Sequence, residues 1–230
     1  MKNVILFDLD DTLIDTHAVF RKYIDALKIF LAKETQREFD EITKVFITIH
    51  NEKFDEFHVD FDRLWPSISK KLIEELGLND HLSVEIQSYL DSILHEVPKL
   101  KDGVVETLEE LRIREYSLGL VTHALKDWTD FKLDSLALRN YFTHIEIADA
   151  SGVKSSSCWL HALSQFNIKP EDGIVVGDNI NGDIIAAHSI GVRRLFWVDQ
   201  KNGWSVYRTG ELPESTITLR EISELIDYLE

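Results

Sequence analysis

Four short segments of the sequence carry polar side chains at or just beyond the ends of apolar runs. They are Asp-Leu-Asp-Asp-Thr at 8–12, Thr-His at 122–123, a lysine at 154, and Gly-Asp-Asn-Ile-Asn-Gly-Asp at 177–183. Parallel α/β sheets place ligands at the carboxyl ends of their strands, so we expect these segments to meet at one edge of a sheet. Carboxylates there would hold a hard divalent cation and supply a nucleophile, while a hydroxyl and an ammonium would balance the charge of transferring oxygens. The set indicates phosphoryl transfer.

Asp8 and Asp10 have the strongest physical reason for a function. Two acids that follow a buried strand are costly unless a cation compensates them. A single Asp in such a position is more often a helix cap or a solvated carboxylate, and we assign Asp11 and Asp15 to that class. Thr122 and Lys154 would each be unremarkable alone, and they become candidates because of their order in the chain.

The segments that would position these residues alternate between helix and strand from residue 98 onward. Strands are predicted at 116–122, 143–148, 173–177 and 193–198, with helices between them. This alternation is typical of a parallel sheet with right-handed crossovers. The apolar run at 3–8 is predicted to join the same sheet as a buried strand.

Residues 16–97 have a different pattern, with four amphipathic helices in sequence. Thr35 and Glu38 predict a capping box at the start of the second helix, and Pro66 predicts the first turn of the third. Four such helices indicate a small bundle inserted into the sheet domain.

The predicted fold is therefore α/β, a Rossmann-like parallel sheet core with an inserted α-helical bundle cap. The core is expected to comprise residues 1–15 and 98–230, and the cap residues 16–97. All four polar segments fall in the core, so we expect the core to be the catalytic domain.

The charge of the chain excludes some classes of partner. Its 25 Lys and Arg residues are outnumbered by 41 Asp and Glu residues, which gives a formal net charge of −16. We therefore expect neither nucleic acid nor an anionic membrane as a partner. A small anion still fits, because a metal or a few local positive groups override the global sign. The single cysteine, Cys158, cannot form an internal disulfide, and no targeting segment is recognised, so a cytoplasmic protein is expected.

The ordered set DLDDT, LVTH, Lys154 and GDNINGD resembles the haloacid dehalogenase superfamily. The similarity continues through the stretch KLDSLALRNYFTHIEIADASGVK and covers nearly all of residues 1–15 and 98–198. The helical insertion after the first motif is similar to the helical cap of the phosphatase branch. The resemblance implies a hydrolase that uses Mg²⁺ and passes phosphate through an aspartyl-phosphate intermediate.

The resemblance also implies a role for each matching residue. Asp8 matches the nucleophile, and Asp10 matches the general acid/base, which protonates the leaving oxygen and later deprotonates the attacking water. Thr122 and Lys154 match the groups that bind the phosphoryl oxygens and neutralise their charge. His123 stands where relatives commonly have Asn, and its backbone N–H is expected to contact the phosphate.

The implied metal ligands are oxygen atoms, which suit Mg²⁺. They are a carboxylate oxygen of Asp8, the backbone carbonyl of Asp10 and the carboxylate of Asp178. Asp183 matches the acid that holds a metal-bound water or Lys154.

Other functions are compatible with parts of this pattern. A receiver-type signalling domain would place its phosphorylated Asp after the third strand, and the order here does not fit. A dehalogenase lacks the second acid of the first motif, whereas Asp10 is present. A sugar phosphomutase with the same catalytic set remains an alternative, as does a non-catalytic phospho-ligand-binding module.

The expected substrate is a small phosphorylated metabolite, such as a nucleoside monophosphate or a sugar or glycolytic phosphomonoester. The predicted cap holds ten Lys and Arg residues and sixteen Asp and Glu residues, which disfavours polyanionic substrates. A bundle inserted directly after the nucleophile loop would close over a small substrate and disfavour a phosphopeptide.

Overall fold

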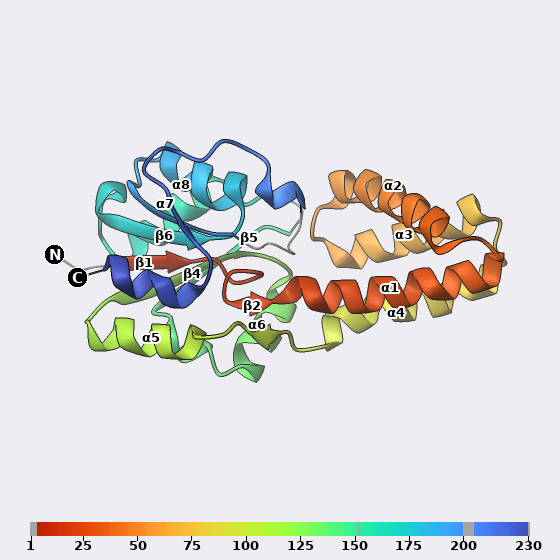
Figure 1. Cartoon of the computed structure of the whole chain (residues 1–230), viewed down its shortest axis with the longest axis horizontal. Helices are drawn as coiled ribbons and strands as arrows, with labels where there is room; N and C mark the ends of the chain where they lie inside the picture. Colours follow the sequence, from red (N-terminus) through yellow and green to blue (C-terminus); the bar gives the residue numbers. More distant parts are fainter. Residues whose placement is uncertain (1–3, 151, 200–204, 230) are drawn as a thin grey trace. The chain divides into compact units, whose positions relative to one another are not determined.

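The computed structural model describes residues 4–150, 152–199 and 205–229 (Figure 1). The chain forms two compact units. One is made of the described residues of Met1–His17, Pro98–Asp149 and Val153–Glu230, and the other of those of Ala18–Val97 and Ala150–Gly152. Within the described residues, no helix is both long and apolar enough to cross a membrane.

The first unit is built on a six-stranded sheet in which every neighbouring pair of strands is parallel. The strand order is β5-β4-β1-β6-β7-β8. The strands are β1 (Val4–Phe7), β4 (Ser117–His123), β5 (His144–Ala148), β6 (Gly173–Gly177), β7 (Arg194–Val198) and β8 (Ile217–Leu219). This confirms the predicted Rossmann-like sheet and adds β8, which the sequence analysis missed.

Strand β1 lies between β4 and β6, and this order positions the candidate site. Phe7 pairs with Leu120 of β4 on one side and with Val176 of β6 on the other. The backbone N–H of Asp8 continues the ladder by donating to the carbonyl of Val176 at 2.9 Å. Residues that follow the three strands therefore meet at the same edge of the sheet.

Helices cover both faces of the sheet. They are α5 (Val104–Ile113), α6 (Lys126–Ser135), α7 (Ser156–Gln165) and α8 (Ala186–Ser189), with a π-helical turn at Ile180–Ile185 before α8 and a 3₁₀ segment at Ile222–Tyr228. Figure 1 shows α7 and α8 on one side of the sheet and α5 on the other. Side chains of β1 alternate between two buried clusters, because successive residues of a strand point to opposite faces. Ile5 and Phe7 belong to the α5 side, and Val4 and Leu6 to the α7 side.

A small antiparallel pair of strands marks the point where the chain leaves this unit and returns. Ile14 and Asp15 of β2 (Ile14–Asp15) pair with Leu100 and Lys99 of β3 (Lys99–Leu100). The helical residues between them in sequence make up nearly all of the second unit.

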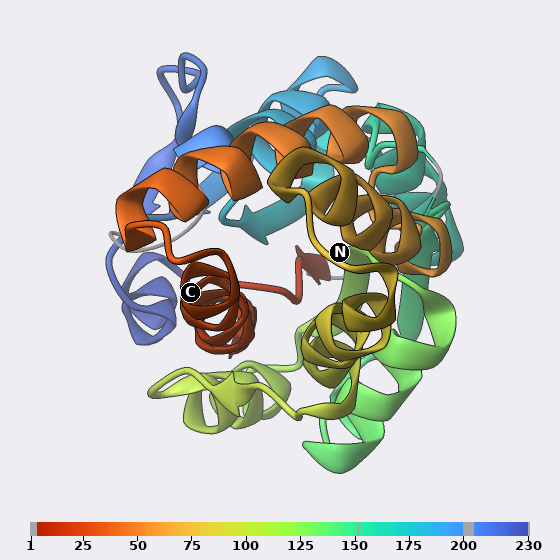
Figure 2. The ribbon, with the colours of Figure 1, turned by 90° about the vertical axis from the view of Figure 1, so that its right-hand side faces the viewer.

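The second unit contains four helices, as predicted. They are α1 (Thr16–Thr35, of which the first two residues belong to the first unit), α2 (Phe39–Phe57), α3 (Phe61–Leu76) and α4 (Ser83–His95). Figure 2 shows α1 end-on and α2 from the side, so these two helices cross instead of running antiparallel. Aromatic packing joins α1 to α3, since the ring of Phe20 lies 5.9 Å from that of Phe61 and 6.1 Å from that of Trp65.

Two local predictions in this unit were wrong. Thr35 is the last residue of α1 and donates its hydroxyl to the carbonyl of Leu31, so it does not take part in a capping box with Glu38. Pro66 lies inside α3, which begins at Phe61, and not in its first turn. Both signals depend on where a helix begins, which is the least certain feature of a sequence pattern.

Candidate active site

The turn after β1 is tight and held by backbone hydrogen bonds. Leu13 N–H donates to the carbonyl of Leu9 at 2.9 Å, and Asp11 N–H donates to the carbonyl of Ile14 at 2.8 Å. Asp11 has a φ of 62°, a left-handed conformation that Asp adopts more readily than most residues. Its carboxylate accepts a hydrogen bond from the backbone N–H of His17 at 2.8 Å, at the start of α1.

Asp11 was predicted to be a helix cap or a solvated carboxylate. Its hydrogen bond to the first turn of α1 is that of a cap, and the residue is buried and not solvated. Only 3% of the residue is exposed. Burial raises the pKa of Asp11 to about 7, although the hydrogen bond from His17 acts in the opposite direction. Asp11 links the loop after β1 to the first turn of α1, and this link helps to hold the neighbouring Asp10 in place.

Lys154 contacts an acid of the first motif and an acid of the last motif. Its ammonium contacts a carboxylate oxygen of Asp8 and lies 2.6 Å from Oδ1 of Asp183. The other carboxylate oxygen of Asp8 accepts a hydrogen bond from the hydroxyl of Thr12 at 2.8 Å. The side chains of Lys154 and Asp8 are 6% exposed and that of Asp183 is fully buried, so this is a largely desolvated charge cluster.

Negative charge in this cluster exceeds positive charge. Burial raises the pKa of Asp8 to about 7, with Lys154 opposing the rise and Asp183 adding to it. Burial, with Asp8 and Asp183 next, also raises the pKa of Asp178 well above its ordinary value. Burial alone would lower the pKa of Lys154, but the carboxylates of Asp183 and Asp8 together raise it. The lysine therefore stays charged and cannot neutralise all three acids.

Asp183 is held by the turn that follows β6. Asn179 donates its backbone N–H to Oδ2 of Asp183 at 3.0 Å, and its own side chain accepts from the N–H groups of Asn181 and Gly182. Gly177 lets this carboxylate approach the strand, because a Cβ built on Gly177 would lie 2.2 Å from Oδ2 of Asp183.

Asp10 has a separate set of partners. Both of its carboxylate oxygens contact the ammonium of Lys132, at 2.6 and 2.8 Å. The hydroxyl of Thr16 donates to Oδ1 at 2.5 Å, and that of Thr122 lies 3.4 Å from Oδ2. The sequence analysis placed Asp10 and Thr122 at one site, and the structure brings them together.

The contacts of His123 differ from those of its neighbour in the motif. Thr122 is buried and its hydroxyl faces Asp10. The ring of His123 instead faces the backbone carbonyl of Asp149, which lies 3.0 Å from Nε2. The side chain of His123 is therefore engaged with the backbone of Asp149.

Sequence reasoning missed Lys132 and Tyr207. Lys132 is fully buried in α6, where Trp128, Thr129 and Leu133 share its buried face. A lysine on the buried stripe of a helix requires a counter-charge, and that spacing was a signal that could have found it. Burial raises the pKa of the half-buried Tyr207, and the carboxylate of Asp178 adds to the rise.

Three carboxylates form a group that fits a divalent cation. One oxygen each of Asp8, Asp178 and Asp183 lie within 4.8 Å of one another, and all three residues are buried. When all three are ionised, the single ammonium of Lys154 leaves two negative charges, which one divalent cation would balance. An all-oxygen ligand set suits Mg²⁺.

A second possible ligand group has different chemistry. His144, Glu146 and His161 lie at edge strand β5 and on α7, and Oε2 of Glu146 is 3.3 and 2.7 Å from the two imidazoles. Nitrogen ligands favour zinc-like metals over Mg²⁺. The buried carboxylate group is thus the better candidate for Mg²⁺.

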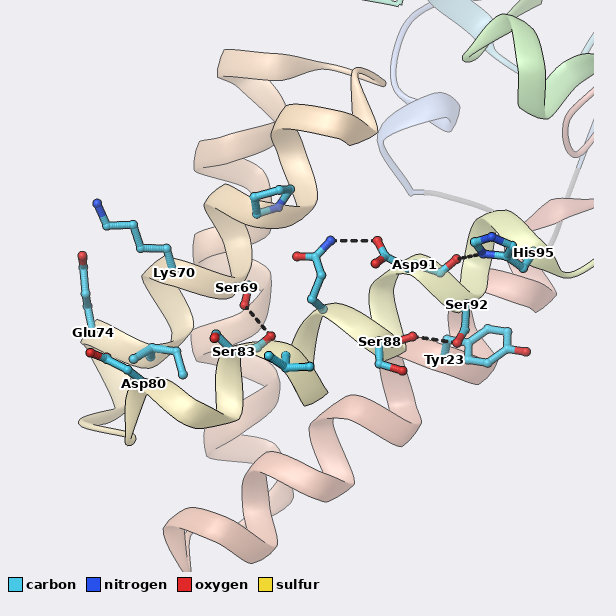
Figure 3. Close-up of a pocket in the computed structure, with 14 residues that line it drawn as sticks. Tyr23, Ser69, Lys70, Glu74, Asp80, Ser83, Ser88, Asp91, Ser92 and His95 are labelled. Carbon is cyan, nitrogen blue, oxygen red and sulfur yellow. Dashed lines mark hydrogen bonds between the residues drawn. The ribbon is translucent and has the colours of Figure 1, made fainter.

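One pocket in the described part of the chain belongs to the helical unit. It has a volume of about 1220 Å³, and its lining includes Ser69, Lys70, Asp91 and His95 (Figure 3). None of the motif residues lines it. The candidate site is therefore recognised by its buried charges and not by the size of a cavity.

Comparison with known proteins places this chain in a family. The model of the haloacid dehalogenase-like hydrolases matches residues 2–191. This chain belongs to that family. The match spans all four motifs, so the resemblance seen in the sequence is confirmed.

Relatives in this hydrolase family support the assignment. The chain is 29% identical to the glyceraldehyde 3-phosphate phosphatase of Pyrococcus furiosus, covering 99% of this chain and 92% of that protein. It is 25% identical to the human N-acylneuraminate-9-phosphatase, and the match covers 93% of this chain and 89% of that protein. A haloacid dehalogenase-like hydrolase from Xanthomonas campestris has the same fold, with a TM-score of 0.74 at 18% identity, covering 93% and 87%. The named relatives are phosphatases, which is consistent with a phosphoric monoester hydrolase.

We expect Gly177→Ala to inactivate the enzyme by displacing Asp183. The added Cβ would overlap the carboxylate at 2.2 Å and push it away from Lys154. Overpacking of this kind also destabilises the fold, by about 1–3 kcal/mol. Gly182→Ala is the matched control, because the atom nearest to its added Cβ belongs to the side chain of Asn179, at 3.0 Å, and not to Asp183. Thermal unfolding and turnover should both separate the two variants, and equal activity would show that the approach of Asp183 to the strand is dispensable.

Proposed function

We propose that this protein is a Mg²⁺-dependent phosphatase that hydrolyses a small phosphomonoester through an aspartyl-phosphate on Asp8. The observation that carries the proposal is the buried contact of Lys154 with both Asp8 and Asp183, beside the third acid Asp178. A desolvated cluster with excess negative charge attracts a cation, and the cation in turn allows a phosphate anion to approach.

Asp8 is proposed as the nucleophile. One of its oxygens contacts Lys154 and the other accepts from Thr12, so the carboxylate is fixed in orientation before substrate binds. Its attack on phosphorus forms the acyl phosphate bond and breaks the ester bond to the leaving oxygen. Lys154 then neutralises charge on the phosphoryl oxygens, and the hydroxyl of Thr122 is proposed to bind one of them.

Asp10 is proposed as the general acid/base. In the first step it gives a proton to the leaving oxygen, and in the second it takes a proton from the water that attacks phosphorus and frees Asp8. With the oxygens of Asp8 and Asp178, the backbone carbonyl of Asp10 would hold the Mg²⁺, and Asp183 would orient it through a water. When bound, the ion supplies charge neutralisation and alignment of the phosphoryl group.

The substrate is proposed to be a small phosphorylated metabolite. The named relatives include phosphatases of glyceraldehyde 3-phosphate and of an N-acylneuraminate 9-phosphate, both small phosphomonoesters. We propose that residues 1–15 and 98–230 form the catalytic domain and that the helical residues 16–97 form a cap that contributes substrate selectivity.

Asp8→Asn is expected to lower phosphatase turnover by roughly 10⁴-fold or more, because an amide cannot form the acyl phosphate. The fold should survive, since the amide has the same shape and Lys154 retains its contact with Asp183. Asp172→Asn, at an exposed acid of the same unit, is the control and should keep full activity. Substantial turnover by a folded Asp8→Asn protein would rule out the covalent mechanism.

Chelation of divalent cations is expected to abolish activity, and Mg²⁺ should restore it. Mg²⁺ should also raise the unfolding temperature, because a ligand that binds only the folded state at a hundred times its Kd stabilises it by about 2.7 kcal/mol. Asp178→Asn should weaken this shift, since it removes one carboxylate of the group. Unchanged activity after exhaustive chelation would contradict a metal-dependent reaction.

A panel of phosphate esters tests the proposed substrate class. Small sugar, glycolytic and nucleoside monophosphates should be hydrolysed with kcat/KM values well above those of phosphopeptides. The assay should follow released phosphate and also isomerised sugar phosphate, so that a phosphomutase is detected. Preference for phosphopeptides, or isomerisation without phosphate release, would refute a metabolite phosphatase.

A further inference from the structure

We infer that Lys132 is a positioning residue, whose buried ammonium fixes the carboxylate of Asp10 for proton transfer. The inference rests on the proposed function, because it concerns the group proposed there as the general acid/base. It adds a residue of α6 that lies outside the four sequence motifs.

The geometry makes Lys132 the main anchor of Asp10. Its ammonium lies 2.6 Å from Oδ1 and 2.8 Å from Oδ2, so it contacts both oxygens. The two hydroxyls around Asp10, of Thr16 and Thr122, each contact a single oxygen. Of the described residues, Lys132 alone restrains the carboxylate against rotation about its last bond while also balancing its charge.

Burial shows that Lys132 acts through Asp10. The side chain of Lys132 is fully buried, whereas that of Asp10 is 23% exposed. A substrate can therefore reach the carboxylate but not the ammonium behind it. Lys132 is for this reason a positioning residue and not a phosphate ligand.

The surroundings of Lys132 argue against a role in packing alone. Its neighbours on the buried face of α6 are Trp128, Thr129 and Leu133, and its ammonium lies 3.7 Å from the centre of the Trp128 ring. An apolar side chain of similar length would fill this space without the penalty of burying an ammonium. A lysine here is explained by Asp10, an acid of the first motif that its ammonium contacts through both oxygens.

The test is a double-variant cycle measured on two classes of substrate. Lys132→Met removes the charge and keeps the length of the side chain, and Asp10→Asn removes the proton-transfer group. General acid/base catalysis contributes roughly 10²–10⁴-fold. We therefore expect Lys132→Met to lower kcat on an alkyl phosphate by about 10–100-fold, with KM little changed. The loss should be several-fold smaller on p-nitrophenyl phosphate, whose leaving group needs no proton.

The decisive measurement is the effect of Lys132→Met in the Asp10→Asn background. If the lysine acts only through Asp10, the second substitution should cause no further loss of turnover on p-nitrophenyl phosphate. A further loss equal to that in the wild-type background would overturn the inference, as would equal losses on both substrates or wild-type turnover of the single variant.

Two controls keep the result interpretable. If Lys132→Met does not fold, Lys132→Gln, which keeps a neutral N–H donor at similar length, enters the same cycle with the same expectations. Asp8→Asn, measured in parallel, separates the two proposals. Activity of that variant would refute the covalent mechanism, whereas its inactivity together with an additive cycle would refute only the role of Lys132.

Discussion

A lysine shared between two buried acids is the constraint on which this fold's site depends. Lys154 comes from the segment before α7, Asp8 from the end of β1 and Asp183 from the turn after β6, and all three side chains are nearly or fully buried. An isolated buried ion is destabilising by several kcal/mol, so none of these segments can be placed independently of the other two. The strand order satisfies the constraint, because β4 and β6 lie on either side of β1 and bring their ends to the same edge.

The excess of buried acid in this cluster affects both the stability of the fold and the reactivity of Asp8. Asp178 adds a third acid that the lysine cannot neutralise, and the pKa of Asp8 rises to about 7 because burial disfavours its charged form. A protonated carboxyl is a poor nucleophile, so the folded protein gains from a cation at these oxygens both in stability and in the charge state of Asp8. The surplus of acid therefore makes sense as a cation site and would be a liability without one.

The sequence predicted the parallel sheet and the motif residues because both depend on local order along the chain: apolar runs followed by polar groups. It failed where a residue's state depends on distant contacts. Asp11 was predicted to be a helix cap or a solvated carboxylate, and only the folded turn shows that it is buried. Lys132 was missed, and its partner Asp10 lies far away in the sequence, in the turn after β1. Pro66 was placed by a helix-start rule, but α3 begins five residues earlier. Strand β8 was missed because Ile217–Leu219 is only three residues long.

The two acids of the first motif differ because each has its own lysine in a different environment. Asp8 competes with Asp183 for Lys154, within a group of three acids. Asp10 pairs with Lys132 through both oxygens, and its other contacts are neutral hydroxyls. Environments that separate two neighbouring carboxyl groups are the usual basis for giving them different chemical tasks. An acid in a cation-deficient cluster suits a metal-assisted nucleophile, and an acid in a locally neutral pair, open to substrate on one side, suits proton transfer.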